Sequence, residues 1–153
     1  MKRLFCVLFT LLFVFNLSSC KKTPSAQTIL AEFFAAYDAR RTVYSSDKGL
    51  YEEGYISPEL LRRLYVFDGE LDCEFARAPN ERTESGFEAG VFIADSSGEI
   101  GTITEMCRER LNLLLGGYSE GIILRRGRVI FYTSASDSLK AEKLFAKIIG
   151  AYY

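Results

Sequence analysis

The apolar run from Leu4 to Leu17 most limits how this chain can fold, because it separates the first residues from the rest. Positive charge precedes it in Met1–Arg3, and the small residues Ser18 and Ser19 follow it. As a helix its 14 residues would be about 21 Å long, whereas bilayer hydrocarbon is roughly 30 Å thick. The pattern predicts a cleaved export signal over residues 1–19.

Cys20 ends this segment in the order Leu17-Ser18-Ser19-Cys20. A hydrophobic residue and two small residues before a cysteine resemble the lipobox of bacterial lipoproteins. The resemblance implies that the Cys20 thiol carries a diacylglycerol thioether, so that membrane lipid is its partner. Two acyl chains would give stable attachment. An ordinary secretory signal and a short anchor helix are the alternatives.

Residues 20–24 would then form a lipidated tether, because the first helix is expected to begin at Pro24 or Ser25. At about 3.3–3.6 Å per extended residue, the folded body would stay within roughly 15–20 Å of the membrane. Lys21 and Lys22 could each add about 1 kcal/mol of attraction to anionic headgroups, or could be a solvated spacer. We therefore expect an exported domain anchored on the extracytoplasmic side of the cell membrane.

Composition excludes several function classes. The 19 basic residues fall to 17 without Lys2 and Arg3, against 20 acidic residues, which gives the mature chain a net charge of −3. Nucleic-acid binding would require a clear basic excess, so no nucleic-acid partner is expected. The chain contains no histidine, which excludes Ser-His or Cys-His catalysis and histidine-ligated metals. We expect neither a metal nor a cofactor.

Cys73 and Cys107 are the cysteines left outside the export signal and the lipidation position. The hydrophobic pattern predicts that both lie in the core, where cysteine behaves as a small hydrophobic residue. Two buried thiols are the favoured interpretation, and a disulfide is the alternative for an exported domain.

Hydrophobic periodicity predicts one α+β domain over residues 25–153. The expected elements are helices near 25–41, 58–68, 100–115 and 139–149, and strands near 71–76, 87–94, 121–124 and 129–133. These form two N-terminal helices followed by a ββαββα core. We expect an antiparallel sheet of about four strands with helices packed on one face.

From Ser57 onward the order of features resembles a family of exported bacterial lipoproteins, domain of unknown function 4358 (DUF4358). The matching features, over residues 57–149, are a leucine-rich helix ending in tyrosine (Leu60–Tyr65), Glu88 before the apolar Val91-Phe92-Ile93, a charged helix (Glu105–Leu115), Tyr118, a hairpin (Leu124–Tyr132) and Ala141-Glu142-Lys143. The loop between the third helix and the hairpin is shorter than is usual in that family. The resemblance implies a lipoprotein setting and no established activity, and therefore no catalytic residues.

Arginines gather at the predicted hairpin tip. Arg125, Arg126 and Arg128 could contact phosphate, an anionic envelope polymer or lipid headgroups, since guanidinium groups suit anions. The alternative is that their charge protects a sheet edge from pairing with another sheet.

Tyrosines interleave with acids in the aperiodic residues 42–56. Tyr44, Tyr51 and Tyr55 could form a binding loop for carbohydrate or peptide, or could cover the edge of the core. Asp72 and Glu74 could form a carboxylate pair, but alternation of polar residues on an exposed strand face predicts the same pattern and is the favoured interpretation. The acids of residues 47–53 match no known calcium loop.

These patterns favour a membrane-anchored lipoprotein of unknown molecular role, and more specifically a non-enzymatic binding or accessory domain of the cell envelope. Its partner would be an envelope polymer or a membrane protein. One alternative is an accessory subunit of a membrane enzyme complex that modifies envelope polymers. A carboxylate-dependent enzyme would need two acids about 5–10 Å apart in a cleft.

Overall fold

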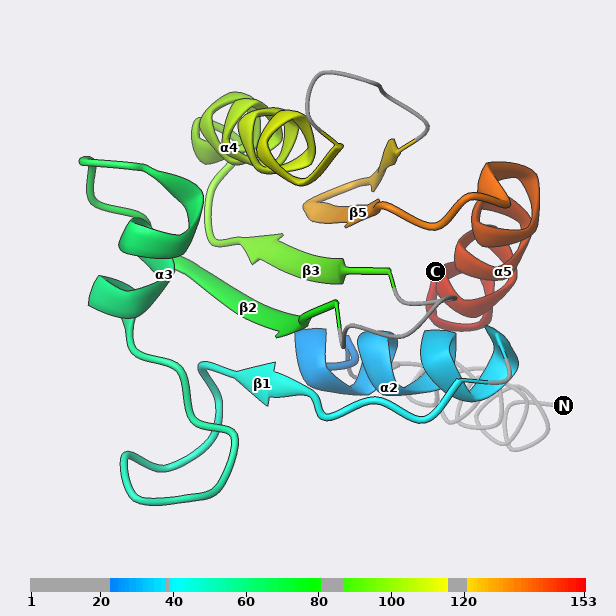
Figure 1. Ribbon diagram of the computed structural model, residues 1–153, viewed down its shortest axis with the longest axis horizontal. Helices are drawn as coiled ribbons and strands as arrows, with labels where there is room; N and C mark the ends of the chain where they lie inside the picture. Colours follow the sequence, from blue (N-terminus) through cyan, green and yellow to red (C-terminus); the bar gives the residue numbers. More distant parts are fainter. Residues whose placement is uncertain (1–22, 38, 81–86, 116–120) are drawn as a thin grey trace, which may run out of the picture.

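The computed structural model describes residues 23–37, 39–80, 87–115 and 121–153 (Figure 1). The predictions for residues 1–19, Cys20, Lys21, Lys22 and Tyr118 lie outside these ranges. In chain order the elements are α2 (Ala26–Tyr37), β1 (Tyr44–Ser45), α3 (Pro58–Tyr65), β2 (Cys73–Ala78), β3 (Ala89–Ala94), α4 (Glu99–Leu115), β4 (Ile122–Arg126), β5 (Val129–Thr133) and α5 (Ser138–Tyr152).

The described strands form an antiparallel sheet in the order β1-β2-β3-β5-β4. The α+β class and the ββαββα order of β2 to α5 are confirmed. The sheet has five strands rather than about four, because Tyr44 and Ser45 pair with β2 as a strand of two residues. A strand that short shows no alternation in the sequence.

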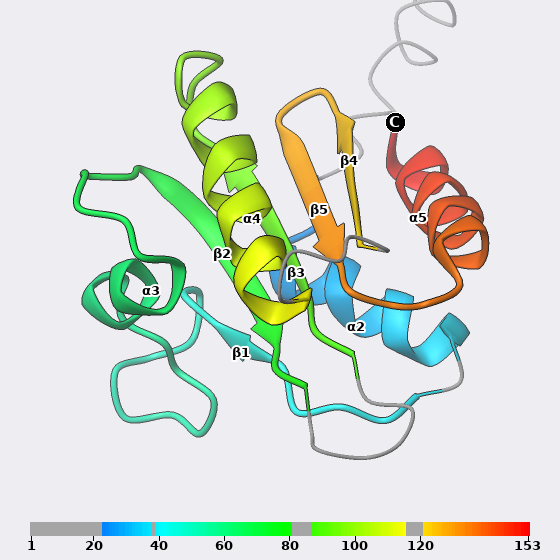
Figure 2. The same cartoon turned by 45° about the horizontal axis from the view of Figure 1, so that its top comes forward.

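Helices cover both faces of the sheet, and the expectation that they pack on one face is wrong. One core joins α2 and α5 to the sheet through residues such as Phe33, Val91 and Phe145. A second core joins α3 and α4 to the opposite face through Phe92 and Ile103. Figure 2 shows α4 crossing in front of the sheet. The reason is that β3 and β5 are buried along their whole length, so both of their faces require cover.

Local signals explain where most helices begin and end. The Ser25 and Ser57 hydroxyls accept the Thr28 and Leu60 N–H groups at 3.1 and 3.2 Å, as N-caps do. Helix α2 ends at Tyr37, and the Ala39 N–H donates back to the Phe34 carbonyl at 3.0 Å. The predicted extension to residue 41 is therefore wrong.

The hairpin between β4 and β5 is the tight turn that was predicted. Gly127 and Arg128 form a two-residue loop, and Gly127 has a φ of 58°. Glycine at the first loop position with positive φ is typical of a type II′ turn, whose twist matches the flanking strands. Among the described helices, none is long and apolar enough to span a bilayer.

Candidate functional site

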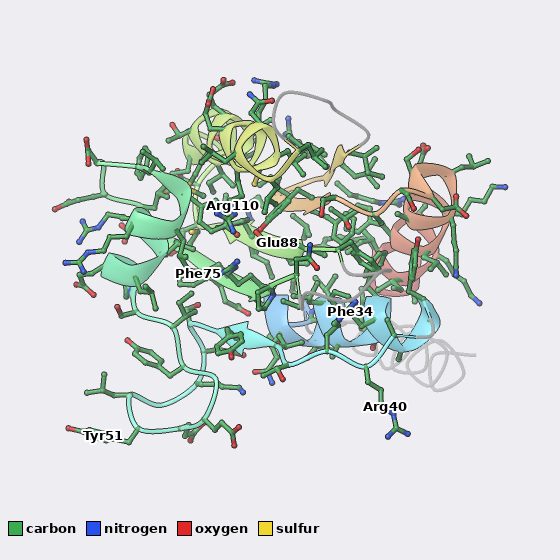
Figure 3. All side chains as sticks on the ribbon, in the orientation of Figure 1. Phe34, Arg40, Tyr51, Phe75, Glu88 and Arg110 are labelled. Carbon is green, nitrogen blue, oxygen red and sulfur yellow. The ribbon has the colours of Figure 1, made fainter. Side chains whose placement is uncertain are left out.

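A buried ionic cluster centres on Glu88, whose side chain is only 1 % exposed (Figure 3). Arg110 of α4 forms a two-pronged contact, with Nε 2.8 Å from Oε1 and Nη2 2.8 Å from Oε2 of Glu88. Arg77 of β2 donates through Nη2 to Oε2 at 2.6 Å. The cluster thus joins the start of β3 to β2 and α4.

Two tyrosines complete the cluster. The Tyr132 hydroxyl donates to Oε1 of Glu88 at 2.6 Å and lies 2.5 Å from the Tyr65 hydroxyl. Gly90 makes this arrangement possible, because a Cβ there would stand 2.4 Å from Cε1 of Tyr132. The second core therefore has a polar centre that ties α3 and β5 to Glu88.

The surroundings of Glu88 keep its carboxylate ionised. Burial by itself would raise its pKa, but the hydrogen bonds from Arg110, the charge of Arg77 and the Tyr132 hydroxyl together hold that pKa below its ordinary value. Burial raises the pKa of Tyr65 and of Tyr132, so both phenols stay neutral. The described ion pairs thus place one acid between two cations in a buried network.

The sequence pattern points to Glu88, the acid before an apolar strand, but not to its two arginine partners. Arg77 lies between Ala76 and Ala78 in a strand, and Arg110 stands three residues after Cys107 on the buried stripe of α4. A charged residue inside an apolar pattern was the signal that could have indicated a buried pair.

The structure places Arg125, Arg126 and Arg128 at one hairpin but on different sides of it. Arg125 and Arg126 are neighbours in β4, so their side chains leave opposite faces of the sheet. Nε of Arg125 donates to the Gly127 carbonyl at 2.9 Å, and Nη1 of Arg128 donates to the Asp95 carbonyl at 2.8 Å. All three are exposed, and no described carboxylate forms an ion pair with them.

A groove of about 610 Å³ lies between α4 and β4. Its lining residues include Ile100, Gly101, Thr104 and Arg108 from α4, and Ile123 and Arg125 from β4. A Cβ added to Gly101 would meet no atom within 4 Å, so the missing side chain opens the groove on the helix side. Of the three hairpin arginines, Arg125 thus borders a concave surface that the sequence did not indicate.

The three loop tyrosines are divided between core and solvent. Tyr51 is 97 % exposed and points away from the body in Figure 3. Tyr44 packs against the second core. Tyr55 is half-buried and pairs with Ser45 in an isolated parallel β-bridge. Covering the core edge therefore explains Tyr44, whereas Tyr51 remains available for contact.

The two cysteines of the body are free thiols. The prediction of two buried thiols is confirmed for Cys107, whereas Cys73 is only half-buried. Burial, with nearby carboxylates, raises the pKa of Cys73 to about 12, and burial also raises that of Cys107.

Asp72 and Glu74 differ in burial and in their hydrogen-bond partners. Asp72 is exposed and precedes β2, which starts at Cys73 and not at residue 71 as expected. Glu74 is half-buried, and its carboxylate accepts the Ala26 N–H at the start of α2. Among the described residues, no group of three potential ligands could hold a metal ion.

No family model, curated protein or solved structure matches this chain. The resemblance to domain of unknown function 4358 therefore stays a prediction.

Proposed function

We propose that this chain is an extracytoplasmic lipoprotein, anchored in the cell membrane through Cys20, whose domain binds a partner and performs no catalysis. The observation that carries the proposal is the short separation between the lipobox cysteine and the fold. Helix α2 begins at Ala26, six residues after Cys20. At about 3.3–3.6 Å per residue, a lipidated Cys20 would hold the domain within roughly 20 Å of the bilayer.

A binding role is supported by how the buried acid Glu88 and the half-buried acid Glu74 are used. Glu88 is enclosed by Arg77, Arg110 and Tyr132 and does not face a second acid. Glu74 accepts a helix N–H. Acid–base catalysis by carboxylates would need two such groups converging on a substrate. Among the exposed features of the described residues, the arginine hairpin and the groove beside it suit recognition.

The proposal is tested by expressing the full-length protein in bacteria with radiolabelled palmitate. We expect label on the protein and a mature mass that corresponds to a lipidated chain starting at Cys20. Cys20→Ala should lose the label and stay unprocessed, whereas Cys6→Ala, in the signal segment, should behave as the unaltered protein does. Label retained by Cys20→Ala, or a lipid-free mature protein in the medium, would disprove the anchor.

A further inference from the structure

We propose that the free edge of β4 and the groove beside it bind an extended acidic segment of a partner protein, which pairs with β4 as a further strand. This inference rests on the proposed binding function and names its site and its partner chemistry. Strand addition at a sheet edge is an established mode of peptide recognition, with backbone bonds for affinity and side-chain pockets for specificity.

The first support is the direction of the backbone groups in β4. Two backbone hydrogen bonds show which residues around β5 direct their N–H and C=O groups toward β3. The Ser134 N–H donates to the Glu88 carbonyl, and the Ala94 N–H donates to the Arg128 carbonyl. In an antiparallel ladder this direction alternates from one residue to the next, so the backbone N–H and C=O groups of Val129, Phe131 and Thr133 point toward β4. Their partners in β4 are Arg126, Leu124 and Ile122. Ile123 and Arg125 alternate with these bonded residues, so their N–H and C=O groups point away from the sheet, where no described residue bonds to them.

The second support is that these same residues line the groove. The side chains of Ile123 and Arg125 leave β4 on the α4 side, and Ile123 packs against the second core. An added strand would therefore direct alternate side chains into the space that Gly101 leaves open beside α4. Figure 2 shows β4 at the end of the sheet, with α4 on one side of it. The opposite edge, β1, has only two residues and offers a shorter ladder.

The third support is charge, which selects the occupant. Arg125, which lines the groove, forms no ion pair with a described carboxylate, and neither do Arg126 and Arg128 at the same hairpin. Glu105, which also lines the groove, is already paired with Arg108. A second copy of the chain would bring the same arginines against these, and like charges on adjacent strands repel. An acidic segment would satisfy both the unpaired backbone and the unmatched guanidinium groups.

The probe is a fluorescein-labelled peptide of about eight residues, the usual length range of a strand, with Val and Glu alternating on one face and Thr on the other. Binding to the full-length protein in nonionic detergent is measured by fluorescence anisotropy. We expect saturable binding that weakens with salt. Replacing Glu by Lys, or methylating alternate backbone nitrogens, should each weaken it by about tenfold or more.

Arg125→Glu and Arg126→Glu form a matched pair, because both reverse one charge on β4. Only Arg125 faces the groove and has outward backbone groups, so Arg125→Glu should weaken binding by about tenfold and Arg126→Glu by less than about threefold. Equal loss for both variants would indicate attraction to any anionic surface, including a membrane, and would overturn the inference.

Gly101 offers a test that leaves the edge untouched. Gly101→Trp should fill the groove and abolish binding, whereas Gly101→Ala should bind as the unaltered protein does, because its added Cβ meets nothing. Circular dichroism checks that both variants are folded. Unchanged binding by a folded Gly101→Trp, no binding by the unaltered protein, or a dimer whose formation the peptide does not compete with, would also overturn the inference. The palmitate experiment reports on the anchor independently, so failure of one proposal is distinguishable from failure of the other.

Discussion

The hydroxyl oxygens of Tyr65 and Tyr132 lie 2.5 Å apart in the core, although 67 positions separate the two residues along the chain. Tyr132 uses its single hydroxyl proton for Glu88, so Tyr65 is the donor in the bond between the two phenols. The order of donation therefore runs from α3 through β5 to the carboxylate. This order predicts unequal consequences when each hydroxyl is removed.

Tyr65→Phe should destabilise the protein by about 0.5–1.5 kcal/mol, because it removes one neutral hydrogen bond. Tyr132→Phe should cost more, about 1–3 kcal/mol, because it removes a donor from a buried charged acceptor and leaves Tyr65 without a partner. Urea unfolding followed by circular dichroism measures both values. Equal losses would contradict the assigned direction of donation.

Glu88→Gln should destabilise the protein more than either tyrosine variant, by about 3–5 kcal/mol in the free energy of unfolding. The reason is that Arg77 and Arg110 would become buried cations without a counter-charge. Glu142→Gln is the matched control, since Glu142 lies on an exposed position of α5. The control should leave the urea midpoint unchanged. A midpoint for Glu88→Gln close to that of the control would show that the ion network contributes little.

Acid should weaken the fold through the same group. The pKa of Glu88 in the folded protein lies below its ordinary value of about 4.3. Its ionised carboxylate therefore contributes fully to the free energy of unfolding above about pH 4.3, and this contribution is lost as the pH falls through the folded-state pKa. Glu74 changes the stability in the opposite direction as the pH falls, because burial raises its pKa. The difference in stability between the unaltered protein and Glu88→Gln, measured from pH 6 to pH 3, should therefore shrink at the acid end. A constant difference would contradict the role given to the carboxylate.

Gly90→Ala should destabilise the fold by about 1–3 kcal/mol, because the new methyl group would collide with the Tyr132 ring and push it away from Glu88. Gly150→Ala is the comparison, since a Cβ at Gly150 in α5 meets no atom within 4 Å. Thermal unfolding should show a lower midpoint for the first variant and an equal or higher midpoint for the second. An unshifted midpoint for Gly90→Ala would mean that the Tyr132 ring has room to move.

The thiols of the body should react slowly with iodoacetamide at pH 8. The pKa of Cys73 is raised to about 12, so little of it is thiolate, and Cys107 is buried as well. Peptide mass spectrometry should show Cys73 modified before Cys107, and both modified rapidly in urea. Fast modification of Cys107 in the folded protein would contradict its burial.

Local chemistry made several elements predictable from the sequence. Ser57 and Pro58 start α3, and Gly127 supplies the positive φ of the hairpin turn, because each signal acts within a few residues. The elements that were missed depend on distant partners. Strand β1 exists because Tyr44 meets Arg77, and Arg77 is buried because Glu88 and not solvent faces its guanidinium group. Local periodicity carries no information about such pairs.

The same limit applies to the candidate site. The sequence placed Arg125, Arg126 and Arg128 together at a hairpin, which the structure confirms. It could not show that Arg125 and Gly101 border one groove, because that contact depends on how α4 crosses the sheet. The unpaired edge of β4 depends likewise on the strand order and not on any residue of β4.

The bond from the Ala26 N–H to the Glu74 carboxylate has a mechanical consequence. The described chain enters the body at this point, with Ala26 and Ile29 fully enclosed beneath it. A pull on the preceding residues would therefore load this contact with β2 together with the first turn of α2, where the Ile29 N–H donates to the Ser25 carbonyl. If the chain is tethered to a bilayer there, force from the lipid anchor would reach the sheet through Glu74 as well as through the helix.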